Sequence, residues 1–166
     1  MNIIIASFFI ALSLFGSVST KTAKVKAKDL QQLTGKQWRG NLTYLDYGKN
    51  EKVSIPSNLT VTRSTVNNLS WIFDYQYPDE PKANNKETIV ISKDGKIIDD
   101  ETVIERTSQT DGTLKIVTEK SGTDNDKKAT FRFTYLINKT SFSIKKEVKL
   151  DDAKEFFERN EYSWKI

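Results

Sequence analysis

Apolar and aromatic residues recur at every second position along most of the chain that follows residue 34. Trp38, Leu42 and Tyr44 share one parity, and Leu59 and Val61 share one parity in the next segment. A period of two places successive side chains on opposite faces of a β-strand, whereas a helix face repeats every three to four residues. The pattern therefore predicts a succession of strands, each with one face toward a core and the other toward solvent.

Short polar segments interrupt this alternation and predict tight turns between neighbouring strands. Gly48-Lys49-Asn50, Asp94-Gly95 and Asp111-Gly112 contain the residues that turns favour. Residues 78–85 contain two prolines and two asparagines, so we expect an irregular loop there. The strands predicted in this way cover residues 38–46, 53–63, 71–77, 88–92, 97–107, 113–119, 130–137 and 141–150, followed by a last strand that ends at residue 166.

The spacing of these strands defines the fold class. About nine strands joined by short hairpins, with no long crossover, predict a single all-β domain. Such a meander favours an antiparallel up-and-down β-barrel, because closure leaves no exposed strand edge. Helical character is confined to residues 24–33, where Asp29 is a candidate N-cap and Gly35 a candidate stop signal. The predicted fold is a barrel with a short N-terminal helical turn.

The N-terminal segment has the pattern of a signal peptide. Residues 1–20 contain no charged side chain, and residues 3–14 are apolar except for two serines. Ser17 and Ser19 supply the small residues that precede a cleavage site. We interpret residues 1–19 as a signal peptide, 20–34 as a basic tail with a short helix, and 35–166 as the barrel domain. We therefore expect a soluble exported protein, periplasmic or secreted, with no stable membrane span; a retained anchor is the alternative.

The segment that opens the barrel resembles a known superfamily. Gly35 and Trp38 follow the short helical segment and lead into the first strand, as in calycin proteins, the lipocalins and fatty-acid-binding proteins. In lipocalins this tryptophan plugs the closed end, and a basic residue late in the last strand packs over it. The resemblance implies that Arg159 or Lys165 takes that place, and that the interior binds a small, mostly apolar ligand. Two residues separate Gly35 from Trp38, where lipocalins usually have one.

The composition excludes several kinds of chemistry. The chain contains no histidine and no cysteine, which rules out Ser-His-Asp and Cys-His nucleophiles and zinc sites built from these ligands. The carboxylates of residues 99–101 are interpreted as turn residues. Residues 122–126 lack the spacing of a calcium loop and are also interpreted as a turn. We therefore expect no enzyme activity and no cofactor.

Polar residues on the inward faces are the candidate binding residues. Arg63 shares the parity of Leu59 and Val61, and Lys146 shares that of Phe142. A buried charge without a partner is costly, so these groups must pair, reach the barrel mouth or contact a ligand. The candidate ligand-binding residues are Tyr44, Arg63, Trp71, Tyr75, Tyr77, Lys146 and Tyr162.

These residues have two interpretations. Arg63 or Lys146 pairs with Glu158 in an internal network, or one of them holds an anionic head group in an aromatic pocket. We expect an exported barrel that binds a small hydrophobic or amphipathic ligand, an anionic one included. The alternative is a filled barrel that acts as a protein-interaction or envelope module through loop 78–85. The net charge of +4 is attributed to a solvated lysine-rich tail, so no nucleic-acid partner is expected.

Overall fold

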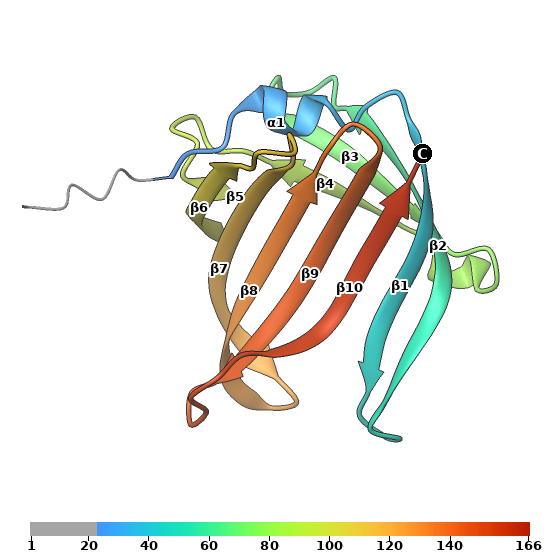
Figure 1. Ribbon diagram of the computed structural model, residues 1–166, viewed down its shortest axis with the longest axis vertical. Coiled ribbons are helices and arrows are strands. Elements are labelled where there is room, and N and C mark those ends of the chain that lie inside the picture. The colour runs from blue at the N-terminus through green and yellow to red at the C-terminus, as the bar shows by residue number, and fades with distance from the viewer. Residues whose placement is uncertain (1–22) are drawn as a thin grey trace, which may run out of the picture.

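The chain forms one antiparallel sheet that curls into a nearly closed barrel (Figure 1). The computed structural model describes residues 23–166, so the predicted signal peptide lies outside the described residues. The sheet order is β4-β3-β2-β1-β10-β9-β8-β7-β6-β5. The elements are α1 (Ala27–Gln31), β1 (Gln37–Asp46), β2 (Glu51–Arg63), β3 (Ser70–Gln76), η1 (Pro81–Ala83), β4 (Asn85–Val90), β5 (Ile97–Ile98), β6 (Glu101–Ser108), β7 (Leu114–Asp124), β8 (Lys127–Ile137), β9 (Ser141–Leu150) and β10 (Phe157–Lys165). The predicted up-and-down barrel is confirmed.

The strands form where the sequence alternates, because each strand buries one face against the interior. On β2, Leu59 and Val61 are buried while Thr60 and Thr62 between and beside them are exposed. β1 pairs with β2 on one edge and with β10 on the other, so the first and last strands of the barrel are neighbours. Apart from β4 and β5, strands that follow one another in the sequence are paired in the sheet, as the short polar segments predict.

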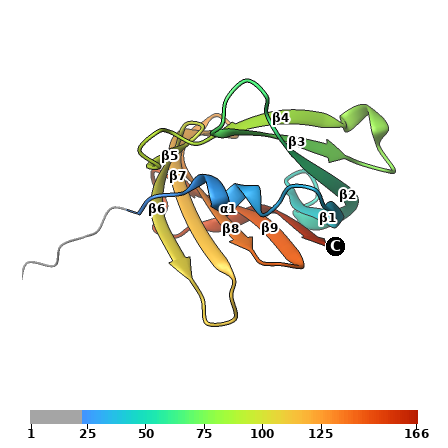
Figure 2. The same ribbon diagram turned by 90° about the horizontal axis from the view of Figure 1, so that it is seen from above.

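The two edge strands, β4 and β5, meet at one end only. The Asp99 N–H donates to the Val90 carbonyl oxygen at 2.8 Å, and the Val90 N–H donates to the Asp99 carboxylate at 2.7 Å. Ile91 and Ile98 form an isolated bridge beside them. Within residues 23–166, the only strand that pairs with residues 85–89 is β3. Because β4 has no second partner there among the described residues, the wall has a gap beside β4. In Figure 2, β4 runs along the upper edge of the barrel and β5 lies at the left.

Three features around this gap differ from the sequence prediction. β4 begins at Asn85 rather than at residue 88, because its pairing with β3 extends to Tyr75. The loop before it, predicted to be irregular, contains the short 3-10 helix η1. The strand predicted for residues 97–107 is divided into β5 and β6, which brings the strand number to ten. Asp99 turns the chain between them with a φ of 54°.

The hairpin between β7 and β8 is also tighter than predicted. Residues 122–126 were expected to form a polar loop, but β7 continues to Asp124, which pairs with Lys127. The turn consists of Asn125 and Asp126, with φ angles of 47° and 63°. Asn and Asp tolerate this left-handed conformation, and two such residues match the twist of a two-residue hairpin. Backbone hydrogen bonds to β8 therefore extend β7 into a segment whose side chains are polar.

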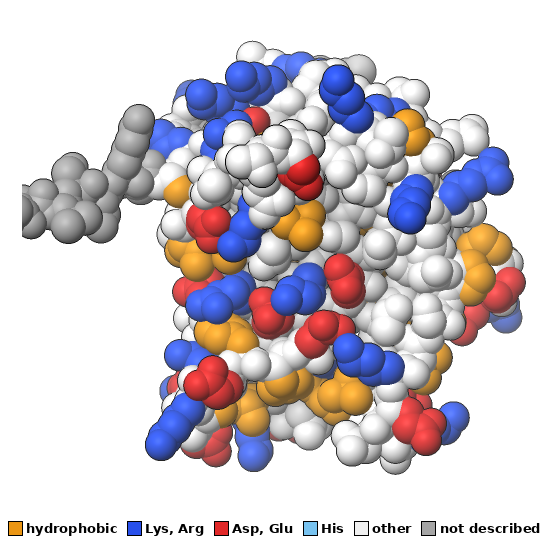
Figure 3. Space-filling model, in the orientation of Figure 1, with side chains coloured by type: hydrophobic (Ala, Val, Ile, Leu, Met, Phe, Trp, Pro, Cys, Tyr) orange, Lys and Arg blue, Asp and Glu red, His pale blue; other side chains and the backbone are white. Residues whose placement is uncertain are grey.

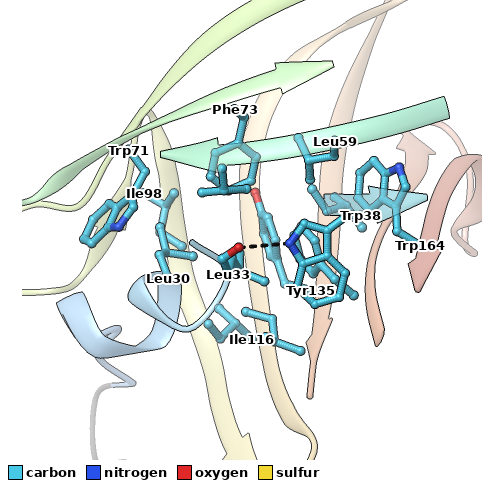
Figure 4. Close-up of a cluster of buried hydrophobic side chains, with 14 of the residues drawn as sticks. Leu30, Leu33, Trp38, Leu59, Trp71, Phe73, Ile98, Ile116, Tyr135 and Trp164 are labelled. Atoms are coloured by element: carbon cyan, nitrogen blue, oxygen red, sulfur yellow. Dashed lines mark hydrogen bonds between the residues drawn. The ribbon is translucent and has the colours of Figure 1, made fainter. Parts of the chain in front are cut away.

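Helix α1 covers one end of the barrel, above Trp38. The Trp38 side chain is fully buried, and its Nε1 donates to the Leu33 carbonyl oxygen at 2.9 Å (Figure 4). Its ring packs edge to face against Phe142, with the ring centres 6.0 Å apart. Leu30 and Leu33 of the helical segment are also buried against this core. The helix end of the barrel is therefore filled.

The basic neighbour of Trp38 comes from the segment before β1 and not from the last strand. Lys36 Nζ lies 4.9 Å from the centre of the Trp38 ring. The guanidinium of Arg159 instead covers the ring of Tyr47 at 4.1 Å, and Lys165 is exposed. The lipocalin resemblance implies that Arg159 or Lys165 packs over Trp38. Neither side chain does so, because both point away from Trp38 on β10.

Asp29 fastens α1 to the barrel wall. The helix begins at Ala27, earlier than predicted, and Asp29 accepts the Lys26 N–H at 2.8 Å from the third helical position. The Asp29 carboxylate also accepts two hydrogen bonds of 2.7 Å from the Arg106 guanidinium on β6. Asp29 is only 2% exposed. A buried ion pair therefore joins the helix to the sheet.

The outer surface carries charges of both signs. In Figure 3 basic side chains gather near α1 at the upper rim, where Lys24, Lys26 and Lys28 are exposed, and acidic and basic side chains alternate over the wall below. No helix within residues 23–166 has the length and apolar character needed to cross a membrane. The basic rim agrees with the lysine-rich tail seen in the sequence.

Candidate functional site

A cavity of about 390 Å³ lies inside the barrel and reaches the gap beside β4. Ile89 of β4 lines one side of it and Ile144 of β9 the other. Five aromatic side chains from three strands, β3, β8 and β10, form the aromatic wall of the cavity. These aromatic lining residues are Phe73, Tyr75, Phe133, Tyr135 and Tyr162. The interior is therefore filled at the helix end and hollow toward the gap.

Charged residues line the same cavity, and acids outnumber bases. The charged lining residues are Glu87, Asp99, Asp100, Glu101, Lys120 and Lys146. Three of the four acids are exposed around the gap, whereas Glu101 is buried and only 7% exposed. Lys120 pairs with Asp100 at 2.9 Å, and this hydrogen bond holds the pKa of Asp100 below its ordinary value. The remaining acids have no such partner among the lining lysines.

Glu101 is the buried acid of the cavity. It opens β6, and its Oε2 accepts hydrogen bonds from the Thr118 hydroxyl at 2.5 Å and from the Tyr135 hydroxyl at 2.9 Å. Burial raises the pKa of the Glu101 carboxyl, although the two hydroxyl donors lower it. Burial also raises the pKa of the Tyr135 hydroxyl, with the neighbouring Glu101 charge adding to the effect. Tyr135 therefore remains a neutral donor to Glu101.

Replacing Glu101 by glutamine is expected to reduce the loss of stability at high pH. The folded protein holds the Glu101 proton more tightly than the unfolded chain, so the unfolding free energy falls as pH rises from the ordinary pKa of 4.5 through the raised pKa. Glutamine keeps an acceptor for Thr118 and Tyr135 and does not titrate. Urea unfolding from about pH 4.5 to about pH 8 should give a shallower decline in Glu101→Gln than in the wild type.

Glu87 and Asp99 also contribute to the decline of the unfolding free energy with pH, in the same direction as Glu101. Both residues are exposed overall, but partial desolvation of their carboxyl groups raises the pKa of each, so part of the decline persists in the variant. Glu80→Gln, at an exposed position of loop 78–85, serves as the control and should follow the wild-type profile. Equal slopes in Glu101→Gln and the wild type would contradict the assignment of the raised pKa to Glu101.

Two of the residues predicted from the sequence, Tyr75 and Tyr162, line the cavity, and Tyr77 contacts Tyr162 without lining the cavity itself. The hydroxyls of Tyr77 and Tyr162 are hydrogen-bonded at 2.7 Å, and the rings of Tyr75 and Tyr162 have centres 5.3 Å apart. Tyr162 in turn stacks on Trp164 with ring centres 5.0 Å apart. Burial raises the pKa of both Tyr75 and Tyr162, so both hydroxyls stay neutral. Tyr75 and Tyr162 offer a ligand ring faces together with neutral hydrogen-bonding groups.

Lys146 also lines the cavity, as predicted, but it is not part of an ion pair with Glu158. Its Nζ lies 4.0 Å from the centre of the Phe131 ring and 5.9 Å from that of Phe133. Within the described part of the chain no carboxylate lies within 4.0 Å of it, and Glu158 pairs with Lys52 at 2.7 Å. Burial lowers the pKa of the Lys146 ammonium. Lys146 is stabilised mainly by aromatic faces.

The other three predicted residues lie away from the cavity. Arg63 stands at the helix end, where its guanidinium binds Gln31 at 2.8 Å and the Asn68 carbonyl oxygen. Trp71 is fully buried in the core beneath α1, as Figure 4 shows. Tyr44 is half-buried on β1 and is absent from the cavity wall. Arg63 and Lys146 therefore belong to separate parts of the barrel.

The buried acid and its two hydroxyl donors were not among the residues predicted from the sequence. Glu101 was interpreted as part of an acidic turn, although it shares the parity of Val103, which is buried on the same strand. Thr118 likewise shares the parity of Ile116 on β7. Strand parity was thus the signal that could have placed both side chains inside the barrel. No protein-family model matches this chain, and no curated protein matches it.

Proposed function

We propose that this protein is an exported, lipocalin-like binding protein that holds a small amphipathic ligand in the cavity and catalyses no reaction. The observation that carries the proposal is a hollow interior with an aromatic wall and a buried carboxyl group. Its volume of about 390 Å³ falls within the range of small-molecule sites, roughly 300–1,000 Å³. Aromatic side chains beside polar groups that fix a ligand's orientation are typical of such sites.

The shape of the barrel supports binding inside it. The aromatic core beneath α1 fills one end, while the cavity continues to the gap between β4 and the turn at Asp99. A ligand can reach the cavity through that gap without breaking a strand pair, since β4 has no second partner over residues 85–89 within the described chain. The calycin resemblance at Gly35 and Trp38 supports the same function, because calycin barrels bind ligands inside.

Uptake of the neutral dye N-phenylnaphthylamine tests the proposal. Its fluorescence rises when it leaves water for an apolar site, and the wild-type protein should bind one dye molecule. Ile89→Trp places a larger side chain in the cavity and should weaken dye binding about tenfold or more, a loss of at least about 1.4 kcal/mol. Ile104→Trp is the matched control, because Ile104 is 46% exposed on the outer wall. It should bind the dye like the wild type.

Failure of the dye test has a definite meaning. If neither the wild type nor Ile104→Trp binds the dye, small apolar molecules do not enter the barrel. That result would overturn the proposal and favour the alternative of a protein-interaction module. Dye binding that is equal in Ile89→Trp and the wild type would place the apolar site outside the cavity. Circular dichroism of both variants establishes that they retain the strand content of the wild type.

A further inference from the structure

The charged residues that line the cavity indicate the charge of its ligand. This inference rests on the proposed function. We propose that the ligand is an organic cation, such as a protonated amine, whose charged group binds beside Glu101. This differs from the anionic head group that the inward parity of Arg63 and Lys146 suggested in the sequence.

Glu101 lacks the counter-charge that a buried carboxylate ordinarily needs. Both of its hydrogen bonds come from neutral hydroxyls, of Thr118 and Tyr135, and both end on Oε2. Among residues 23–166 no lysine or arginine nitrogen lies within 4.0 Å of its carboxylate. Buried charges are usually paired, because desolvation is costly. Oε1 accepts no hydrogen bond from the described residues and can accept one from a ligand ammonium.

The lining lysines form no ion pair with Glu101, although the charge of Lys120 acts on its carboxyl group from a longer distance. Lys120 Nζ donates a hydrogen bond to Asp100 Oδ1 at 2.9 Å. Lys146 is held over Phe131 and Phe133. With the Lys120–Asp100 pair neutral, Glu87, Asp99 and Glu101 face a single lysine across the cavity. When these acids are ionised, the lining is negative, and a cationic ligand gains from it where an anionic ligand is repelled.

The aromatic wall favours the same ligand charge. Cations are attracted to the faces of aromatic rings, and the effect increases in desolvated sites. Tyr135 and Phe133 line the cavity together with Glu101, and Tyr75 and Tyr162 continue the wall toward β10. A ligand with an aromatic or aliphatic body and an amine can therefore place its body on these rings and its charge at Glu101. The exposed acids at the gap attract such a cation from solvent.

Three indole compounds that differ only in their terminal group test the inference by isothermal titration calorimetry. Tryptamine is a cation, tryptophol is neutral and indole propionate is an anion at neutral pH. Tryptamine should bind about tenfold more tightly than tryptophol, and indole propionate most weakly. In Glu101→Gln, which keeps the shape and the hydroxyl partners, the ratio of the tryptamine and tryptophol affinities should fall close to one. Glu80→Gln, in the exposed loop, should keep the wild-type ratio.

Each outcome separates the two proposals. Equal affinities for tryptamine and tryptophol in the wild type, or an unchanged ratio in Glu101→Gln, overturn the cation inference and leave the binding function intact. Preference for indole propionate that is lost in Lys146→Met overturns it in favour of an anionic ligand. If N-phenylnaphthylamine binds but no indole displaces it, the cation inference fails alone. If neither the dye nor any indole binds, the proposed function fails and the inference fails with it.

Discussion

Replacing Gly40 by alanine is expected to destabilise the barrel by about 3 kcal/mol or more, the upper end of the usual cost of overpacking. A Cβ atom at Gly40 would lie 1.8 Å from the Ser163 carbonyl oxygen and 2.8 Å from the Trp164 Cα. These are backbone atoms, which cannot rotate away as a side chain can. β1 and β10 would have to separate at the position where Gly40 pairs with Trp164, and urea unfolding measures the loss.

Gly48 offers a matched control in the turn that follows β1. The nearest atom to a Cβ there is the Asp46 carboxylate oxygen at 3.2 Å, which belongs to a flexible side chain. Gly48→Ala should therefore change the unfolding free energy by less than about 1 kcal/mol. Similar urea midpoints for Gly40→Ala and Gly48→Ala would show that the two strands can move apart at little cost. That result would contradict the close approach of β1 and β10.

Alternation in the sequence was sufficient to predict the fold class, but not the ends of the strands. Parity correctly separates Leu59 and Val61 from their exposed neighbours, because each strand has one face toward solvent and one toward the core. Parity does not predict where a strand ends if both of its faces are polar, as at Asn85 and at Asp124. There the backbone hydrogen bonds to the adjacent strand decide, and the partner strand is remote in sequence. The same limit applies to Gly40, whose role depends on the approach of β10.

The candidate site was predicted in part for a related reason. Parity assigns a side chain to the interior, but it does not say at which height of the barrel that side chain lies. Arg63 and Lys146 were both expected inside, yet Arg63 stands at the helix end with Gln31 while Lys146 reaches the cavity. Glu101 was not predicted because β6 begins within a run of three acidic residues, directly after the turn at Asp99. The sequence does not show where the turn ends and the strand begins. The height of each residue follows from the strand register, which only the three-dimensional pairing fixes.

Replacing Arg106 by methionine is expected to lower the unfolding free energy by about 3 kcal/mol, the lower end of the range for breaking a buried ion pair. The Asp29 carboxylate is 2% exposed and would lose two hydrogen bonds of 2.7 Å. The lower end applies because the Arg106 side chain keeps 20% of its surface exposed. Lys115→Met is the control: Lys115 pairs with Glu105 at 3.0 Å on the half-exposed wall and should cost less than about 1 kcal/mol.

A second variant separates the ion pair from the packing of α1. Asn at position 29 keeps an acceptor for the Lys26 N–H but carries no charge, so Asp29→Asn combined with Arg106→Met leaves no unpaired charge in the buried site. The double variant should therefore be more stable than Arg106→Met alone, although methionine makes no hydrogen bond to the helix. If the two effects simply add, no coupling joins Asp29 to Arg106. The burial of Leu30 and Leu33, and not the ion pair, would then hold the helix on the barrel.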